Sequence, residues 1–214
     1  MASKVGRPRD GDSAETRRRI LQAARIRFAR DGFRATTNRL IASDVGVTSG
    51  AIYHYVDSKA ALYADVYCDT IDELYTEFER VAAEHDDLFS QYSAVLERAC
   101  ELQTNDPSIT GFIVAVAQET QRHPDLLALL SPQRGRHSRF FSGLVAAAAE
   151  RGELAADIDQ RALADLLGAV LTGLARMSAS AGDPARNTAA VEVLGRFLDG
   201  SLRAPVATGS GDLR

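Results

Sequence analysis

Apolar residues recur along most of this chain at intervals of three and four, which is the spacing of one buried face of an α-helix. No segment shows the strict alternation of a half-buried β-strand. The pattern predicts an all-α protein with about nine helices. The first helix is expected to run from Ser13 to Gly32, and the later long ones over residues 59–81, 88–102, 109–119, 140–150, 159–177 and 184–202.

Two shorter helices are predicted between the first long helix and the next. Thr36 and Thr37 are good N-caps for a helix over residues 39–45, and Gly46 begins a tight turn before a second helix over residues 49–55. Two short helices joined by a turn of three or four residues with glycine form a helix-turn-helix. The second helix of such a unit fits the major groove of DNA.

The residues of this second helix suit contact with a nucleic acid. Thr48, Ser49 and Gly50 are small, so the beginning of the helix can approach a phosphate with its free N–H groups. Tyr53 and His54 lie one turn further and can donate to phosphates or base edges. This helix is therefore the predicted recognition helix.

Residues on either side complete the predicted contact set. Thr36 and Thr37 offer hydroxyl groups to phosphate, and Lys59 offers a positive charge at the start of the next helix. Arg39 has two interpretations, a contact in the groove or a solvated surface charge. Tyr55 is predicted to pack inside.

Charge is distributed unevenly along the 214 residues. The net charge is −4, but residues 1–60 hold 12 Lys and Arg against 6 Asp and Glu, whereas residues 61–214 hold 13 against 23. A basic first quarter on an acidic body is typical of a chain whose N-terminal part meets a polyanion.

The segments 36–42 (TTNRLIA) and 46–62 (GVTSGAIYHYVDSKAAL) resemble the DNA-binding signature of the TetR family of transcriptional regulators. The resemblance covers residues 14–63, with one departure at Val56, where the family usually has a Phe that packs the recognition helix. It implies a three-helix DNA-binding domain followed by a helical bundle for ligand binding and dimerisation. It also implies a homodimeric repressor that a small-molecule effector releases from a near-palindromic DNA operator.

These expectations divide the chain into a disordered basic arm (1–13), a helix-turn-helix domain (14–60), a ligand-binding and dimerisation domain (61–203) and a disordered tail (204–214). The arm contains Arg7 and Arg9 beside Pro8. Two interpretations remain for it: Arg7 enters an A·T-rich minor groove, or the arm adds only salt-dependent attraction.

The family places its effector between the middle helices, and the chain offers aromatic and polar candidates there. Each aromatic has the alternative of being plain core, and Gln118 and His123 are further polar candidates. The predicted pocket residues are Tyr67, Phe89, Tyr92, Phe112, Val116, Glu119, Phe140, Phe141 and Arg176.

The last two predicted helices carry more apolar surface than one buried face requires. In residues 159–177, one stripe contains Leu163, Leu166 and Val170, and a neighbouring stripe contains Leu167 and Leu171. The alternatives are monomer core and a four-helix interface between two copies, and the resemblance favours the interface. The predicted interface residues are Leu163, Leu167, Val170, Leu171, Leu174, Val191, Leu194, Phe197 and Leu198.

Motifs for catalysis, cofactors or metals do not appear in the sequence. There is no nucleophile elbow, phosphate loop or zinc spacing, and Glu119 and His123 are one residue too far apart for a di-iron helix motif. Two cysteines and no leader-like apolar stretch suggest a cytoplasmic protein without a membrane partner. The alternative to a DNA-binding regulator is a helical hydrophobic-ligand binder or enzyme without DNA function.

Overall fold

The computed structural model describes residues 10–130, 133, 135–181, 184–198 and 200–202, and within them it contains ten helices and no strand. The predicted all-α fold is confirmed. The predicted tail and residues 1–9 of the predicted arm lie outside the described residues. The helices are α1 (Asp10–Ala35), α2 (Asn38–Val45), α3 (Ser49–Ile52), α4 (Lys59–Ala82), α5 (Leu88–Asn105), α6 (Pro107–Arg122), α7 (Pro124–Leu129), α9 (Arg136–Glu150), α10 (Gln160–Ala181) and α11 (Pro184–Leu198).

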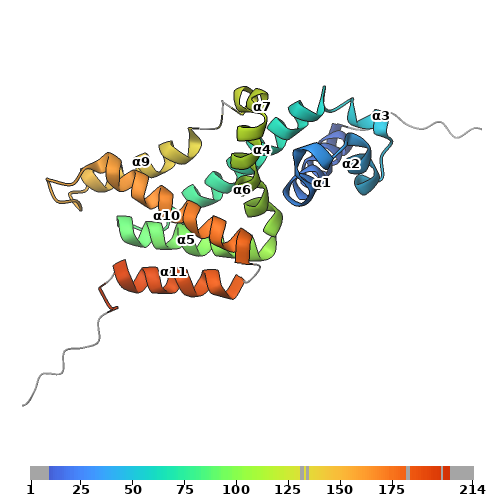
Figure 1. Ribbon diagram of the computed structural model, residues 1–214. Helices are drawn as coiled ribbons and strands as arrows, with labels where there is room; N and C mark the ends of the chain where they lie inside the picture. Colours follow the sequence, from blue (N-terminus) through green and yellow to red (C-terminus); the bar gives the residue numbers. More distant parts are fainter. Residues whose placement is uncertain (1–9, 131–132, 134, 182–183, 199, 203–214) are drawn as a thin grey trace, which may run out of the picture.

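Helices α1, α2 and α3 gather at one end of the molecule, and α4 leads from them into the remaining helices (Figure 1). The last helix, α11, lies beside α5 and α10. Helix α1 begins at Asp10, before the predicted Ser13. Its helical geometry breaks at Gly32, where φ is 78°, as the sequence predicts, although a short helical piece continues to Ala35.

The caps of the helix-turn-helix follow directly from the sequence. The hydroxyl of Thr37 accepts from the Leu40 amide at the start of α2, and that of Thr48 accepts from the Ala51 amide at the start of α3. Gly46 ends α2 with φ 72° and ψ 31°, a left-handed conformation that favours glycine. These caps fix the turn between the two helices.

The predicted recognition helix is shorter than the sequence suggests. Helix α3 ends at Ile52, and the chain then tightens: the amides of His54 and Tyr55 donate to the carbonyls of Ala51 and Ile52, three residues earlier, at 3.1 and 2.8 Å. This i to i+3 pattern continues the helical path as a 3₁₀-like turn. Tyr53 and His54 therefore still follow α3 closely.

Buried apolar residues form two clusters whose boundary lies inside α4. The first cluster joins α1, α2, α3 and the start of α4 up to Val66, and it also includes residues of α6 and α7 such as Phe112 and Leu126. The second begins at Ile71 and joins the rest of α4 with α5, α9, α10 and α11. Tyr67 packs against both clusters. The helix-turn-helix thus completes its core with two helices from the body.

The contact between α1 and α6 contains both an aromatic cluster and a buried ion pair. The rings of Phe28, Tyr63 and Phe112 lie with centroids 4.8 to 6.3 Å apart. Arg25 is only 7% exposed and donates to Asp106 at 2.7 Å and to Ser108 at 3.2 Å, at the junction of α5 and α6. Because a buried charge is costly without a partner, this pair holds α1 against the body in one arrangement.

The left-handed turn gives the first testable prediction. Gly46→Ala is expected to lower the free energy of unfolding by about 1–2 kcal/mol, because a Cβ disfavours this backbone conformation. Gly50→Ala is the matched control, since a Cβ at either position meets no atom within 4 Å and Gly50 has no positive φ. Urea unfolding measures both. Equal stability of the two variants would contradict the assigned turn.

Candidate DNA-recognition surface and ligand cavity

Seven of the nine predicted DNA contacts are exposed on α2, α3 and the turn that follows α3. Thr37 and Arg39 lie at the start of α2. Tyr53, in the turn after α3, is 59% exposed. The other four exposed positions are Thr48, Ser49, Gly50 and His54. We call these seven residues the α2–α3 surface. Arg39 is the one among them with a permanent charge.

The buried sides of α2 and α3 hold this surface in place. Ile41, Ile52 and Val56 are almost fully buried, and Tyr55 packs partly buried against the same cluster. Tyr55 is therefore a packing residue, as predicted, and Val56 lies in the core despite being smaller than the Phe usual in the family.

Two arginines of α1 hold α2 against α1 through hydrogen bonds from their guanidinium groups. Arg27 donates to both carboxylate oxygens of Asp44 at 2.6 and 2.7 Å, and these hydrogen bonds lower the pKa of Asp44. Arg19 donates to the Val45 carbonyl at 2.7 Å, where the last carbonyls of α2 lack helical partners.

The structure does not support the prediction that the Thr36 hydroxyl contacts a phosphate. It is fully buried, and its hydroxyl donates to the Gly32 carbonyl at 2.9 Å. The Thr36 amide also donates to this carbonyl, at 3.4 Å, so the side chain and the backbone of Thr36 both satisfy the Gly32 carbonyl. Thr36 supports the helix-turn-helix from inside and offers nothing to a phosphate in this structure.

The structure also does not support the prediction that Lys59 offers its charge to a phosphate. Its ammonium donates to the carbonyls of Phe33, Thr36 and Arg34 at 2.9, 3.0 and 3.4 Å and lies 4.5 Å from the centroid of the Phe33 ring. All three of its donors are therefore directed at the end of α1, while burial lowers its pKa. Lys59 joins α4 to α1 and does not point freely at a phosphate.

Most of the basic charge of residues 1–60 is also used internally. The side chains of Arg17, Arg18, Arg19, Arg25, Arg27 and Arg30 all donate to carboxylates or carbonyls of the chain. Within the described residues, the side chains of Arg34 and Arg39 have no such partner and are exposed. Arg34 is absent from the contacts predicted from the sequence, although its place two residues before Thr36 was a usable signal.

A cavity of about 130 Å³ lies between α4, α5, α6, α9 and α10. Its wall is mainly apolar, and no Asp or Glu belongs to the described residues that line it. Its polar side chains are Thr110, Thr172, Arg176 and the pair Tyr75 and His137. The apolar residues of its wall come from α4, α5, α6 and α10 and include Leu74, Phe78, Leu102, Ile113, Val114 and Leu171.

Tyr75 and His137 in this wall form a short hydrogen bond, with 2.6 Å between the Tyr75 hydroxyl oxygen and His137 Nδ1. Burial lowers the pKa of His137 and raises that of Tyr75, so both are neutral near pH 7. On its other side the imidazole lies against Gly168, where a Cβ would come within 2.5 Å of Nε2. Gly168 thus leaves the space that the ring occupies.

Most of the predicted pocket residues do not line this cavity, and only Arg176 among the nine does. Phe112 and Val116 fill the first cluster, and Phe140 and Phe141 fill the second. Tyr92 is buried with its hydroxyl donated to the Leu167 carbonyl at 2.9 Å. The remaining predicted residues are placed elsewhere: Tyr67 between the clusters, Glu119 buried beside Gly32, and Phe89 on an open groove.

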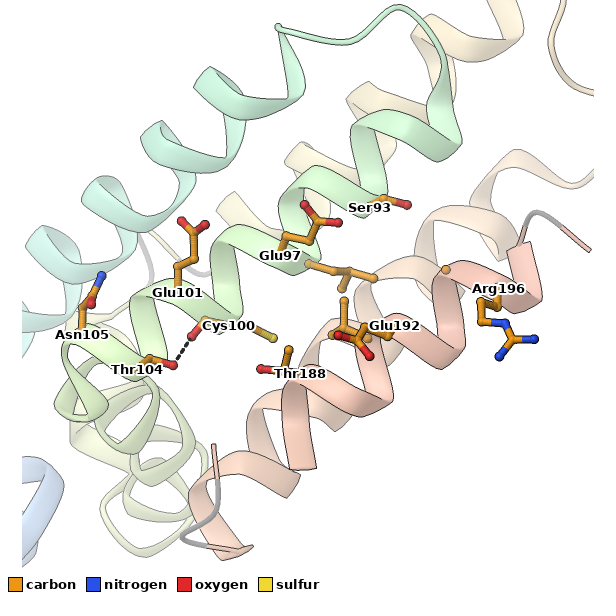
Figure 2. Close-up of a pocket in the computed structure, with 12 residues that line it drawn as sticks. Ser93, Glu97, Cys100, Glu101, Thr104, Asn105, Thr188, Glu192 and Arg196 are labelled. Atoms are coloured by element: carbon orange, nitrogen blue, oxygen red, sulfur yellow. Dashed lines mark hydrogen bonds between the residues drawn. The ribbon is translucent and has the colours of Figure 1, made fainter. Parts of the chain in front are cut away.

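A larger groove of about 850 Å³ runs over the surface between α5 and α11 (Figure 2). Glu97 and Glu101 of α5 and Glu192 of α11 give it three carboxylates, and the Thr104 hydroxyl donates to the Cys100 carbonyl within α5. Ligand sites for small molecules are enclosed and mainly apolar. The smaller cavity between five helices fits that description better than this acidic groove.

The predicted pairing residues divide between core and surface. Leu167, Leu171 and Val191 are buried within the chain, and the partly buried members pack against the second cluster. Phe197 is 65% exposed, and Leu166 and Val193, outside the predicted set, are 58% and 53% exposed. We call Leu166, Val193 and Phe197 the α10–α11 face. The partly buried members are Leu163, Val170, Leu174, Leu194 and Leu198.

Residues 160–180 of α10 form a helix that is long and apolar enough to cross a membrane by length and composition alone. A helix that packs against its own core on one side and an apolar partner on the other has the same composition. Within the described residues, no group of three His, Cys, Asp or Glu side chains is arranged to hold a metal ion.

Comparison with known proteins agrees with this geometry. The profile described as "Bacterial regulatory proteins, tetR family" matches residues 20–66, and that described as "BetI-type transcriptional repressor, C-terminal" matches residues 90–203. The transcriptional repressor KstR2 of Rhodococcus jostii is 29% identical over 157 residues, which is 71% of this chain and 75% of KstR2. The regulator UidR of Escherichia coli is 26% identical over 198 residues, 90% and 96% of the two chains.

Solved structures show the same fold. Salmonella enterica GusR has a TM-score of 0.70 at 26% identity and covers 94% of this chain and 100% of its own. FadR of Bacillus subtilis, in complex with stearoyl-CoA, has a TM-score of 0.74, covering 87% and 99% of the chains. At 16% identity, FadR supports the fold alone. The matched profiles, the named relatives and the exposed helix-turn-helix lead to one conclusion: this chain is a DNA-binding transcriptional regulator of the TetR family.

Proposed function

We propose that the chain acts as a homodimer, that each copy presents its α2–α3 surface to one half of a near-palindromic operator, and that an effector in the cavity releases the DNA. The observation that carries the DNA-binding part is the α2–α3 surface itself, with its exposed donors and with Arg39, which like Arg34 of α1 has no described internal partner. Repression is the activity in the name of the relative KstR2.

Within this proposal the contacts have different roles. Arg34 and Arg39 are the charges directed at phosphates, because the other described arginines of α1 are held by the chain. Thr37, Thr48, Ser49 and Gly50 allow a close approach, and Tyr53 and His54 reach the groove. Thr36 and Lys59 position this surface from behind.

The α10–α11 face supports pairing of two copies. Leu166 of α10 and Val193 and Phe197 of α11 are large apolar side chains with more than half of their surface exposed. Packing them against the same face of a second copy removes this surface from water and forms a four-helix interface. Two-fold symmetry then sets the recognition helices roughly 34–36 Å apart, one turn of DNA.

Helix α6 supports a route from the cavity to the DNA-binding surface. Ile113 and Val114 on one side of α6 line the cavity, while Phe112 and Val116 on another side belong to the core of the helix-turn-helix. A ligand that moves α6 therefore moves the packing of α1 and α4. Release requires that the effector binds the displaced arrangement more tightly than the DNA-bound one.

The relatives are named as transcriptional regulators, so we assign the cavity to binding and not to catalysis. Because a regulator of bacterial genes works where the DNA is, we propose a cytoplasmic location for this protein. The apolar stretch of α10 is then explained by pairing.

A mobility shift tests the proposed function. The full chain is mixed with duplex DNA from beside its own gene and with a scrambled duplex at two salt concentrations. We expect a saturable, salt-sensitive shift that prefers the first duplex, because counterions leave when arginines meet phosphates. Absence of such a shift would favour a ligand-binding protein without DNA function.

The different environments of Arg39 and Lys59 give the second testable prediction. Arg39→Met is expected to change the free energy of unfolding by less than about 0.5 kcal/mol, because Arg39 is exposed and has no described partner. It should weaken DNA binding and reduce the salt slope by about one. Lys59→Met is expected to lower stability by about 1 kcal/mol or more, because three carbonyls lose their donor.

Urea unfolding and the salt dependence of the mobility shift measure the two effects separately. The assigned roles would be contradicted if Lys59→Met were as stable as the wild type while Arg39→Met either unfolded or bound DNA as tightly as the wild type.

The α10–α11 face gives the third prediction. Leu166→Glu is expected to convert the dimer to a monomer in light scattering and to abolish tight operator binding, because two facing carboxylates enter an apolar interface. Leu129→Glu is the control: Leu129 of α7 is 45% exposed and lies on neither helix. A dimer that persists in the first variant, or dissociates in both, would contradict this face as the interface.

A further inference from the structure

The charge of the cavity wall is the first clue to its ligand. Arg176 is the only permanently charged side chain among the described lining residues, and its guanidinium has no hydrogen bond or ion pair with any described residue. In contrast, Arg98, Arg136 and Arg151 in the same part of the chain are paired with carboxylates. A guanidinium fits a carboxylate with two parallel hydrogen bonds.

The second clue is that the other ionisable groups of the wall are neutral. Tyr75 and His137 satisfy one another at 2.6 Å, and burial favours the neutral form of each. No carboxylate competes for Arg176 within the described wall. The cavity therefore carries one positive charge, which complements a ligand with a single negative charge.

The third clue is the size of the cavity. An apolar cavity of about 150 Å³ holds one benzene molecule. The cavity here, at about 130 Å³, accommodates an apolar body of similar size between side chains such as Phe78, Ile113 and Leu171. A long acyl chain with a nucleotide-containing head group is several times larger than this space.

We propose that the effector is a small monocarboxylate with an apolar ring or short chain, whose carboxylate binds Arg176 and whose apolar body enters the cavity. This inference rests on the proposed function, because it names the ligand of that same cavity. Arg176 lies on an exposed turn of α10 at the edge of the cavity, so the carboxylate stays near water while the body is buried. Such an arrangement avoids burying an uncompensated charge.

Calorimetric titration of the full chain with matched probes tests the proposal. Hexanoate and benzoate are compared with hexanol and benzyl alcohol, and with hexylamine and benzylamine. We expect the acids to bind about 10- to 100-fold more tightly than the alcohols, as for a charge-assisted bidentate contact, and the amines to bind most weakly. Acids that bind no better than alcohols, or that do not bind, would overturn the proposal.

Three variants locate the contact. Arg176→Gln is expected to reduce acid binding to the level of the alcohols, whereas Arg161→Gln, at an exposed arginine of α10 outside the cavity wall, should leave it unchanged. Ala117→Phe at the exposed edge of the wall should weaken binding of acids and alcohols together. Wild-type acid binding by the first or third variant would overturn the assigned site.

The DNA mobility shift of the same preparations without any probe keeps the two proposals apart. Loss of acid selectivity with an intact operator shift contradicts the ligand class alone. Acid binding without any operator shift contradicts the proposed function and leaves the assigned ligand class supported.

Discussion

The packing of α1 against α6 is the constraint on which the rest of this structure depends. Phe28 and Tyr63 close their aromatic cluster with Phe112, a residue of the body, and the buried guanidinium of Arg25 finds its carboxylate at Asp106. Neither contact exists within residues 14–60 alone. The helix-turn-helix is therefore held in a fixed position by the helices that also enclose the cavity.

This shared core explains how a small ligand can affect DNA binding without touching it. Helix α6 has one side in the core of the helix-turn-helix and another in the cavity wall, so a ligand in the cavity would act on an element that also packs against the DNA-binding helices. Lys59 and Thr36 continue the connection, because they fasten the ends of α1 and α4 to one another through carbonyl groups. In the proposed mechanism, the α2–α3 surface would therefore be displaced together with α1 and α4.

Local sequence signals predicted the elements and their ends well. The period of three and four residues located the long helices, and Thr37, Gly46 and Thr48 marked the helix-turn-helix because caps and left-handed turns depend on near neighbours. The same signals could not tell which arginines of α1 are free, because their partners, such as Asp44 and Asp106, come from distant parts of the chain. Within the described residues, the lack of a side-chain partner in the folded chain, and not exposure, separates Arg34 and Arg39 from the arginines of α1 that are paired.

The cavity was harder to predict for the same reason. Periodicity shows that Phe112 and Phe140 are buried, but it does not show against which helix, and both fill cores. The residues that do line the cavity, Tyr75 and His137 among them, gave no sequence signal because they lie 62 residues apart. Arg176 was predicted as a polar candidate, because a charged residue within a largely apolar stretch of a helix is visible in the sequence.

Native-state amide hydrogen exchange at increasing urea concentrations tests the shared core most directly. If α1 and α6 form one cooperative unit, amides of residues 20–28 and of residues 112–119 open with the same free energy and the same urea dependence. A helix-turn-helix that opens at a clearly lower free energy, while residues 112–119 stay protected, would contradict the account.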